Sequence, residues 1–210
     1  MIICPTVTAN NTHQYREQIE RVQGFADTLH IDVMDGHFTK TVSPGVSQLW
    51  WPKKVKAQLH LMVEMPMEVI KQAIELKPDL IVVHAEADMS QVAEVLAILK
   101  HKPIKSGVAL LSETNPQEDE VFGMLALADH ALVFSGNLDY HGGEADLKLL
   151  KKVQQIKNFF PDIQIGWDGG INKDNIKELA DGGVDVANVG SFIQRGENPK
   201  ENFDKLKSII

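Results

Sequence analysis

The chain has 210 residues, of which 43% are hydrophobic and 24% charged, so it is long enough for one domain with a sizeable core. The formal net charge of −8 argues against a nucleic-acid groove and against an anionic membrane surface, because both need clustered positive charge. The only cysteine, Cys4, excludes an internal disulfide and fits a reducing compartment. The sequence shows neither a secretory leader nor an apolar run of membrane-spanning length, and we therefore expect a cytoplasmic protein.

Short β-branched runs alternate with longer amphipathic segments along the whole chain. We predict strands near 2–5, 28–34, 55–62, 80–84, 104–110, 130–134, 163–167 and 184–189. We predict helices near 14–23, 66–76, 90–100, 117–127, 145–159, 173–181 and 199–210. The link from Asp35 to Lys54 has no clear period, and we expect it to be irregular.

This alternation indicates an α/β fold made of parallel strand–helix units. No linker or shift in composition divides the chain, so we predict that residues 1–210 form a single (β/α)₈ TIM barrel domain. The structural alternative is an open, doubly wound sheet. A glycine-rich fingerprint after the first strand would favour that fold, and the segment 4–8 (CPTVT) has none.

Polar side chains appear on strand faces that should point into the barrel. His30 and Asp32 alternate with apolar residues in the second strand, His60 ends the third strand, and Asp168 ends the seventh. Each of them alone could be a satisfied polar group in the barrel interior. A barrel floor is normally filled by valine, isoleucine and leucine, and two imidazoles with two carboxylates instead predict a site for a divalent transition metal.

The carboxylates indicate a reaction. A metal bound to a carbonyl and its neighbouring hydroxyl acidifies the C–H bond between them by stabilising an enediolate. Asp32 and Asp168 come from strands two and seven, so they could approach that carbon from opposite faces and invert it. In the alternative, both aspartates act only as metal ligands, and the metal activates water for hydrolysis.

Turns that contain glycine follow the last three predicted strands. They are Gly142-Gly143, Gly169-Gly170 and Gly190-Ser191. Glycine lets the backbone approach an oxyanion, and the loops after strands seven and eight are the usual phosphate site of this barrel. We therefore predict a phosphorylated substrate. Thr6, just past the first strand, either bonds a substrate hydroxyl or begins a turn.

Several motifs together resemble the ribulose-phosphate 3-epimerase family. They are 30–38 (HIDVMDGHF), 60–62 (HLM), 83–86 (VHAE), 107–110 (GVAL) and 168–171 (DGGI), in that family's order and spacing. The resemblance implies a (β/α)₈ barrel that interconverts D-ribulose 5-phosphate and D-xylulose 5-phosphate. It also implies a homo-oligomer and one divalent metal ion, which could be Zn²⁺, Fe²⁺, Mn²⁺ or Co²⁺.

Residue by residue, the resemblance assigns the metal ligands to His30, Asp32, His60 and Asp168. It makes Asp32 and Asp168 the acid/base pair as well, and it puts Thr6 and His60 beside the substrate. Met34 and Met62 match two methionines that line the family's site. The glycine turns named above fall where the family binds its phosphate.

The loop after the sixth strand departs from the family. Only Gly142-Gly143 matches clearly, and Phe134 stands where the family has a methionine. The reaction type is therefore better determined than the substrate, which could be another ketose phosphate such as a hexulose 6-phosphate. A Schiff-base aldolase would need a desolvated lysine at a carboxyl end, whereas Lys56 and Lys105 lie early in their strands. A non-catalytic barrel that binds a sugar phosphate is the remaining alternative.

Overall fold

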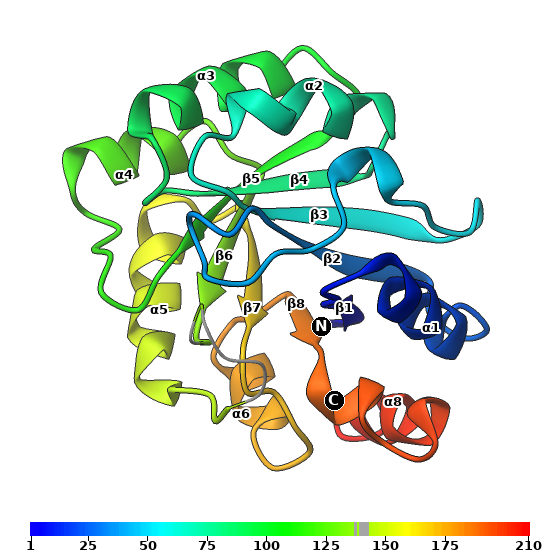
Figure 1. The fold of residues 1–210 in the computed structure, drawn as a ribbon. Coiled ribbons are helices and arrows are strands. Elements are labelled where there is room, and N and C mark those ends of the chain that lie inside the picture. Colours follow the sequence, from blue (N-terminus) through cyan, green and yellow to red (C-terminus); the bar gives the residue numbers. More distant parts are fainter. Residues whose placement is uncertain (137, 139–142) are drawn as a thin grey trace.

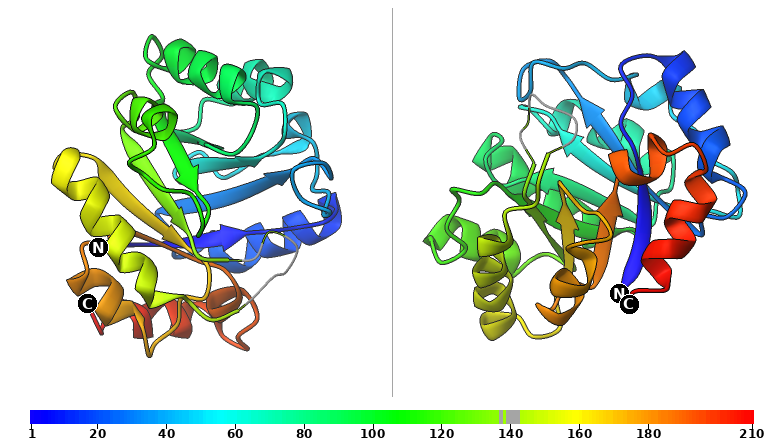
Figure 2. Two further views of the ribbon diagram at one scale, coloured as in Figure 1. Left: turned by 90° about the vertical axis from the view of Figure 1, so that its left-hand side faces the viewer. Right: turned by 90° about the horizontal axis from the view of Figure 1, so that it is seen from below.

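Parallel strands close into a barrel in sequence order in the computed structural model, which describes residues 1–136, 138 and 143–210 (Figure 1). The strands are β1 (Ile2–Val7), β2 (Thr28–Met34), β3 (Lys56–Met62), β4 (Leu80–His84), β5 (Lys105–Leu110), β6 (His130–Phe134), β7 (Gln164–Asp168) and β8 (Val186–Val189). The barrel closes where β1 pairs with β8, and the two chain termini lie close together (Figure 2). The predicted (β/α)₈ TIM barrel is confirmed.

Helices surround the barrel on the outside. They are α1 (Thr12–Val22), α2 (Met67–Glu75), α3 (Met89–Leu99), α4 (Asp119–Leu125), α5 (Leu150–Phe159), α6 (Ile176–Asp181), α7 (Ser191–Gln194) and α8 (Pro199–Lys207), with short 3₁₀ turns η1 (Val46–Gln48) and η2 (Leu147–Leu149). Side chains of Asn11, Asp88 and Asn198 cap α1, α3 and α8, each by accepting a hydrogen bond from a backbone N–H of the first turn.

Apart from shifts of up to three residues at the helix ends, the observed helices differ from the predicted ones in two places. The helix predicted over 145–159 begins as the 3₁₀ turn η2, because the Asp146 side chain accepts a hydrogen bond from the Lys148 N–H and tightens the entry. The four-residue helix α7 was not predicted, since so short a segment carries no measurable periodicity. The link after β2 contains η1 and one isolated bridge between Asp35 and Val42, in agreement with its irregular sequence.

Alternation along β2 explains how one strand serves both the core and the site. Leu29, Ile31 and Val33 belong to the large apolar core between the strands and the helices. His30 and Asp32, on the opposite face, point into the barrel and are also buried. Because both faces of the strand are covered, any polar group on the inner face must find its partners inside the barrel.

Aspartates tie the strands together at the amino end of the barrel. The carboxylates of Asp79, Asp129 and Asp185 accept hydrogen bonds from backbone N–H groups at the starts of β3, β5 and β7, at distances of 2.8–3.1 Å. These contacts satisfy donors that would otherwise lack partners where the strands begin. The carboxyl end is held differently, by side chains that face one another.

Apolar side chains fill part of the barrel interior. Leu80, Val82, Ala109 and Leu132, from β4, β5 and β6, form a separate inner cluster. The histidines and aspartates of β2, β3 and β7 face the same interior beside this cluster, and His60 pairs in register with Val82. In the rest of the interior, polar side chains therefore take the place of the aliphatic layers that normally fill this barrel.

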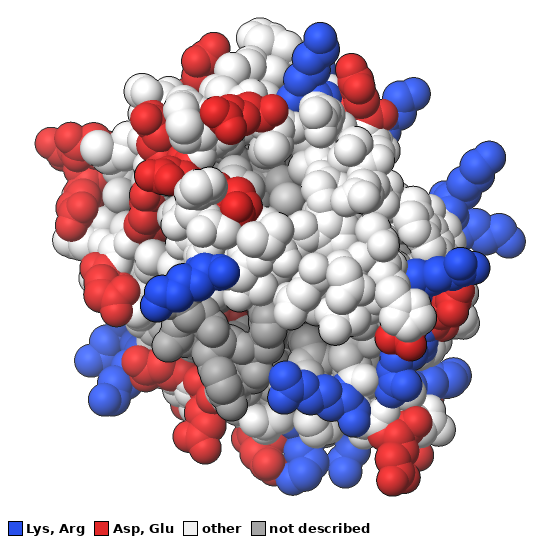
Figure 3. All heavy atoms as spheres, viewed as in Figure 1, with Lys and Arg blue, Asp and Glu red and all other residues white. Residues whose placement is uncertain are grey.

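The surface charge is unevenly distributed. On the face drawn in Figure 3, acidic side chains gather over the region of α3 and α4, and Asp119 and Glu120 lie in the first turn of α4. Lysines and arginines are scattered over the same face, mostly toward its margin. Within the part of the chain that the structure describes, no helix is long and apolar enough to cross a membrane.

Candidate active site at the carboxyl end of the barrel

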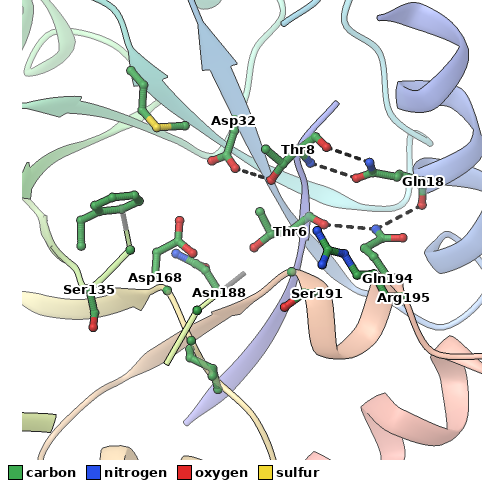
Figure 4. A pocket seen from close by; sticks show the side chains of 18 of the residues that line it. Thr6, Thr8, Gln18, Asp32, Ser135, Asp168, Asn188, Ser191, Gln194 and Arg195 are labelled. Carbon is green, nitrogen blue, oxygen red and sulfur yellow. Dashed lines mark hydrogen bonds between the residues drawn. The ribbon is translucent and has the colours of Figure 1, made fainter. Parts of the chain in front are cut away.

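A cavity of about 590 Å³ lies at the carboxyl ends of the strands. Asp32 and Asp168 point into it from opposite walls, and Figure 4 shows Thr6 and Asn188 beside them. Most of the predicted substrate-binding residues line the cavity: Thr6, Gly143, Gly169, Gly170, Gly190 and Ser191. The predicted Gly142 lies outside the described residues.

The four predicted metal ligands converge beneath this cavity. One nitrogen or carboxylate oxygen from each of His30, Asp32, His60 and Asp168 lies within 4.8 Å of all the others. His30 Nε2 is 3.4 Å from Asp32 Oδ1 and 3.6 Å from Asp168 Oδ2. His60 Nδ1 is 3.1 Å from Asp32 Oδ1 and 3.8 Å from Asp168 Oδ2. Both imidazoles thus direct one nitrogen at the same pair of carboxylates.

The hydrogen bonding of His30 fits a bound cation. His30 is fully buried, and its Nδ1 lies 3.3 Å from Gln58 Oε1, an oxygen that can only accept a hydrogen bond. The proton of neutral His30 therefore belongs on Nδ1, which leaves a lone pair on Nε2. That Nε2 has no hydrogen-bond partner. A buried nitrogen lone pair between two carboxylates is a ligand arrangement that a divalent metal satisfies.

The two aspartates have pKa values shifted in opposite directions. Burial raises the pKa of Asp168 to about 7, and the negative charge of Asp32 adds to the effect. Burial also acts to raise the pKa of Asp32, but its close contacts with the imidazoles of His30 and His60 outweigh it and hold that pKa well below its usual value. At neutral pH and without a metal, Asp32 is ionised, whereas burial and the neighbouring Asp32 charge favour the protonated form of Asp168. Two carboxyl groups tuned apart in this way are suited to different roles in proton transfer.

The two histidines differ as well. Burial lowers the pKa of His60 to about 3, and the contact with the Asp32 carboxylate offsets only part of this effect. For His30 burial again acts to lower the pKa, but its contacts with Asp32 and the charge of Asp168 raise it overall. His60 is therefore a neutral imidazole at pH 7, which is the form that binds a metal.

Asp32 is also held from the β1 side of the cavity. The Thr8 hydroxyl donates a hydrogen bond of 2.5 Å to Asp32 Oδ2. Thr8 is in turn bound through its backbone N–H and C=O to the side chain of Gln18 in α1, at 2.9 and 2.7 Å. The orientation of this carboxylate thus depends on a helix outside the barrel (Figure 4).

Comparison with known proteins agrees with this geometry. The model of the ribulose-phosphate 3 epimerase family matches residues 2–194. A ribulose-phosphate 3-epimerase of Helicobacter pylori is 31% identical over 216 residues, covering 100% of this chain and 98% of that protein. One from Aquifex aeolicus is 32% identical over 219 residues, with 100% and 96% covered. The chain belongs to the ribulose-phosphate 3-epimerase family. Its members are isomerases, and this chain is an enzyme of that class.

Solved structures support the fold of this family member. A crystal structure of 3-hexulose-6-phosphate synthase superposes with a TM-score of 0.77 and covers 100% of both chains at 18% identity. At that identity the likeness concerns the barrel and not the reaction. The predicted family resemblance and the predicted epimerase class are both confirmed by the sequence relatives.

Glycines after β7 let two loops of this epimerase pack closely. Gly169 and Gly170 have φ angles of +111° and +70°, which side chains rarely adopt. A Cβ on Gly169 would lie 2.3 Å from Gly136 N, and one on Gly170 would lie 2.1 Å from Ala145 N. The loop after β6 therefore rests directly on the DGG turn. The indole N–H of Trp167 donates to the Gly169 carbonyl at 3.1 Å and fixes the turn from below.

Two buried residues of the site were not predicted from the sequence. His84, interpreted as structural, lies 2.9 Å from His60 through the Nε2 atoms of both rings. Asn188 lines the cavity at 1% exposure, and neither its Oδ1 nor its Nδ2 has a hydrogen-bond partner. The only signal for either was its inward position on a strand, since β4 ends at His84 and β8 places Asn188 opposite Asp168.

The lysines do not support an aldolase. Lys56 and Lys105 are exposed first residues of β3 and β5, at the amino end. Lys152 is buried but belongs to α5, and its ammonium group donates to the carbonyls of Leu111 and Ser112. None of the described residues that line the cavity is a lysine. Schiff-base chemistry therefore has no nucleophile among them.

Proposed function

We propose that the chain epimerises a ketose phosphate at C3, and that it interconverts D-ribulose 5-phosphate and D-xylulose 5-phosphate. The observation that carries the proposal is the set of four convergent side chains, two of them carboxylates with pKa values moved apart. Family membership supports the same reaction class. The sequence relatives are named for a phosphorylated sugar, which agrees with the glycine turns that line the cavity.

In this proposal His30 Nε2, His60 Nδ1 and one oxygen each of Asp32 and Asp168 hold a single divalent metal ion. The bound ion supplies a Lewis acid that stabilises negative charge on the substrate's carbonyl and neighbouring hydroxyl oxygens. A mixed nitrogen and oxygen donor set accepts Zn²⁺, Fe²⁺, Mn²⁺ and Co²⁺. The cluster supports the presence of one ion, and loading experiments must identify it.

Proton transfer falls to Asp32 and Asp168. One carboxylate removes the proton from C3 on its own side of the substrate, and the other returns a proton to the opposite side, which inverts the carbon. The enediolate between the two steps needs no further base. The opposite positions of the two side chains in the cavity support this division of roles (Figure 4). Reversal of the reaction exchanges the acid and the base.

The remaining residues position the substrate. The Thr6 hydroxyl is buried and without a partner, and we assign it to a substrate hydroxyl beside His60. Backbone N–H groups of the glycine turns bind the phosphate: Gly142, Gly143, Gly169, Gly170, Gly190 and Ser191. Met34 and Met62 form an apolar floor near the reacting carbon. The burial of Thr6, Met34 and Met62 limits the access of water to the enediolate.

The identity of the sugar is the least constrained part of the proposal. The cavity continues past the barrel mouth to Gln14, Glu17 and Arg21 of α1, so a longer ketose phosphate such as a hexulose 6-phosphate also fits. We further expect a cytoplasmic homo-oligomer. A single buried cysteine suits a reducing compartment, and Val42, Trp50 and Met65 are exposed apolar side chains that a second copy could cover.

Proton NMR in D₂O tests the proposal directly. D-ribulose 5-phosphate is incubated with protein that has been stripped by a chelator, and then with the same protein reloaded with each metal in turn. We expect deuterium to enter at C3, and D-xylulose 5-phosphate to appear, only after metal is restored. A folded, metal-loaded protein that exchanges no proton in this sugar or in a ketohexose phosphate would support the non-catalytic alternative.

A further inference from the structure

A row of hydrogen-bonded side chains leads from the metal site toward the loops after β4 and β5. His60 Nδ1 lies 3.1 Å from Asp32 Oδ1, and its Nε2 lies 2.9 Å from His84 Nε2. His84 Nδ1 lies 3.1 Å from Glu86 Oε2. Both rings are fully buried and stacked, with centroids 4.9 Å apart. Water therefore cannot replace the contact between the two rings.

Glu86 is anchored at the far end of this row. Its Oε1 accepts hydrogen bonds from the Leu111 N–H at 2.8 Å and from the Thr114 hydroxyl. Although burial acts to raise the pKa of Glu86, its hydrogen bonds lower it, so the group is a carboxylate and can only accept. Lys152 binds the carbonyls of Leu111 and Ser112 and holds the turn that carries these donors.

Counting protons along the row determines which nitrogen carries each one. Three contacts join Asp32, His60, His84 and Glu86, and when both imidazoles are neutral they supply only two ring protons. Glu86 requires a proton on His84 Nδ1, which makes His84 Nε2 an acceptor. His60 must then carry its proton on Nε2. The contact left without a proton is His60 Nδ1 with Asp32, where His30 Nε2 and an Asp168 oxygen also converge.

We propose that His84 and Glu86 are positioning residues that fix the tautomer of His60 and so present its Nδ1 lone pair to the metal. This inference rests on the proposed metal site. Gln58 fixes the tautomer of His30 in the same way. Here a single amide oxygen accepts the Nδ1 proton, in place of the pair formed by His84 and Glu86. In this role the row of side chains keeps both rings in one tautomer, and it does not conduct protons during the reaction.

Glu86→Gln is the decisive variant because it reverses the direction of the hydrogen bonds along the row and keeps the size of the side chain. The Leu111 N–H and the Thr114 hydroxyl need an acceptor, so the new amide keeps its oxygen there and turns its NH₂ toward His84. His84 Nδ1 must then accept, which moves the ring protons to His84 Nε2 and to His60 Nδ1. A proton now occupies the position of the metal. We expect Zn²⁺ affinity to fall by roughly 10–100-fold.

Zn²⁺ affinity is measured by competition with a chromophoric chelator. Glu113→Gln is the matched control, since it removes the same charge from the same region, where Glu113 is exposed and bonds only the Ser112 side chain among the hydrogen bonds described. We expect the control to bind Zn²⁺ like the wild type. ¹⁵N NMR of the histidine rings in metal-free protein reports the tautomers: a proton on His84 Nδ1 in the wild type and on His84 Nε2 in Glu86→Gln.

The outcomes separate this inference from the proposed function. Unchanged Zn²⁺ affinity in Glu86→Gln, or His84 protonated on Nε2 in the wild type, overturns the inference while leaving the epimerase proposal intact. A wild type that binds no Zn²⁺ overturns the metal site, and the His84 tautomer then tests the row by itself. If Glu86→Gln does not fold, His84→Phe keeps a ring but removes the acceptor for His60 Nε2. The same fall in affinity is expected from it.

Discussion

Two buried histidines in this barrel have nearly the same neighbours and opposite properties. His30 Nδ1 faces Gln58 Oε1 at 3.3 Å, and His130 Nδ1 faces Gln164 Oε1 at 3.2 Å. Both rings are fully buried, and neither Nε2 has a hydrogen-bond partner. Burial lowers the pKa of His130 to about 4, whereas the carboxylates beside His30 overcome the same burial and raise its pKa.

What differs is the group that faces Nε2. Around His30 it is Asp32 and Asp168, at 3.4 and 3.6 Å. Around His130 it is Gly166, where an added Cβ would lie 2.4 Å from Nε2, so this ring fills space that a side chain would otherwise occupy. A buried histidine held by a glutamine is thus not a site in itself. The carboxylates that face His30 make it a candidate metal ligand. His130 faces Gly166 instead and only packs in the interior.

The largest expected effect comes from removing a carboxylate that distinguishes the two histidines. Asp168→Asn deletes one acid/base group, and we expect kcat to fall by about 10²–10⁴-fold even with saturating metal. Far-ultraviolet circular dichroism should be unchanged, because the substitution is isosteric. Asp181→Asn, in an exposed pair with Lys177, is the control and should retain its activity. Full activity of Asp168→Asn would contradict the mechanism with two aspartates.

Substituting each of the two histidines in turn is the next test of this comparison. His30→Asn removes a direct ligand and should reduce Zn²⁺ affinity by more than the roughly 100-fold that an outer partner contributes. His130→Asn should change it little, although it destabilises the fold through lost packing. Chelator competition on both variants gives the two affinities. Equal losses would mean that the carboxylates do not discriminate between the two rings.

The sequence alone predicts which residues form the candidate site, but it does not predict all of their partners. The strands follow from apolar runs, and the inward side of β2 follows from alternation, so His30, Asp32, His60 and Asp168 were predicted to meet at the carboxyl end. The confirmation of that convergence rests on the register of the barrel, which pairs Asp32 with His60 on neighbouring strands. Their roles as ligands and catalysts stay predictions.

The partners of these residues could not be predicted because they depend on ring rotation and on loops. His84 was interpreted as structural, since alternation places it inward but does not say that its Nε2 meets His60. Thr8 lies just past β1, and only the path of the chain toward α1 brings its hydroxyl to Asp32. Residues such as these act through contacts between elements distant in sequence, for which one sequence carries no pattern.

A smaller difference in Zn²⁺ affinity is expected between variants of the two glutamines, Gln58 and Gln164. Gln58→Leu removes the acceptor that keeps the His30 proton on Nδ1, and we expect a roughly 10–100-fold loss of Zn²⁺ affinity. Gln164→Leu makes the same change beside His130, and there we expect no loss of affinity. Both variants are compared with the wild type by the same chelator titration. A loss that is equal in both would point to general loosening of the barrel.

The smallest effects are in stability, and they have opposite signs for the two regions. In metal-free protein the pKa of Asp168 is raised to about 7 from 3.8, so its contribution to stability is complete below pH 3.8 and is lost as the pH rises toward 7. The pKa of His130 is lowered to about 4 from 6.5, so its contribution is complete above pH 6.5 and is lost as the pH falls toward 4. Each slope reaches at most about 1.4 kcal/mol per pH unit.

Urea unfolding of chelated protein between pH 4 and 8 measures both slopes as differences from the wild type. The free energy of unfolding of Asp168→Asn should gain on the wild type as the pH rises to 7, and that of His130→Asn should gain as the pH falls. Zn²⁺ added to the wild type should abolish the first trend, because a bound cation favours the ionised carboxylate, and should leave the second intact. A flat difference curve for Asp168→Asn would mean that both aspartates are ionised in the metal-free fold. The acid and base roles would then have to be set by the metal alone, and not by the burial that the two carboxylates share.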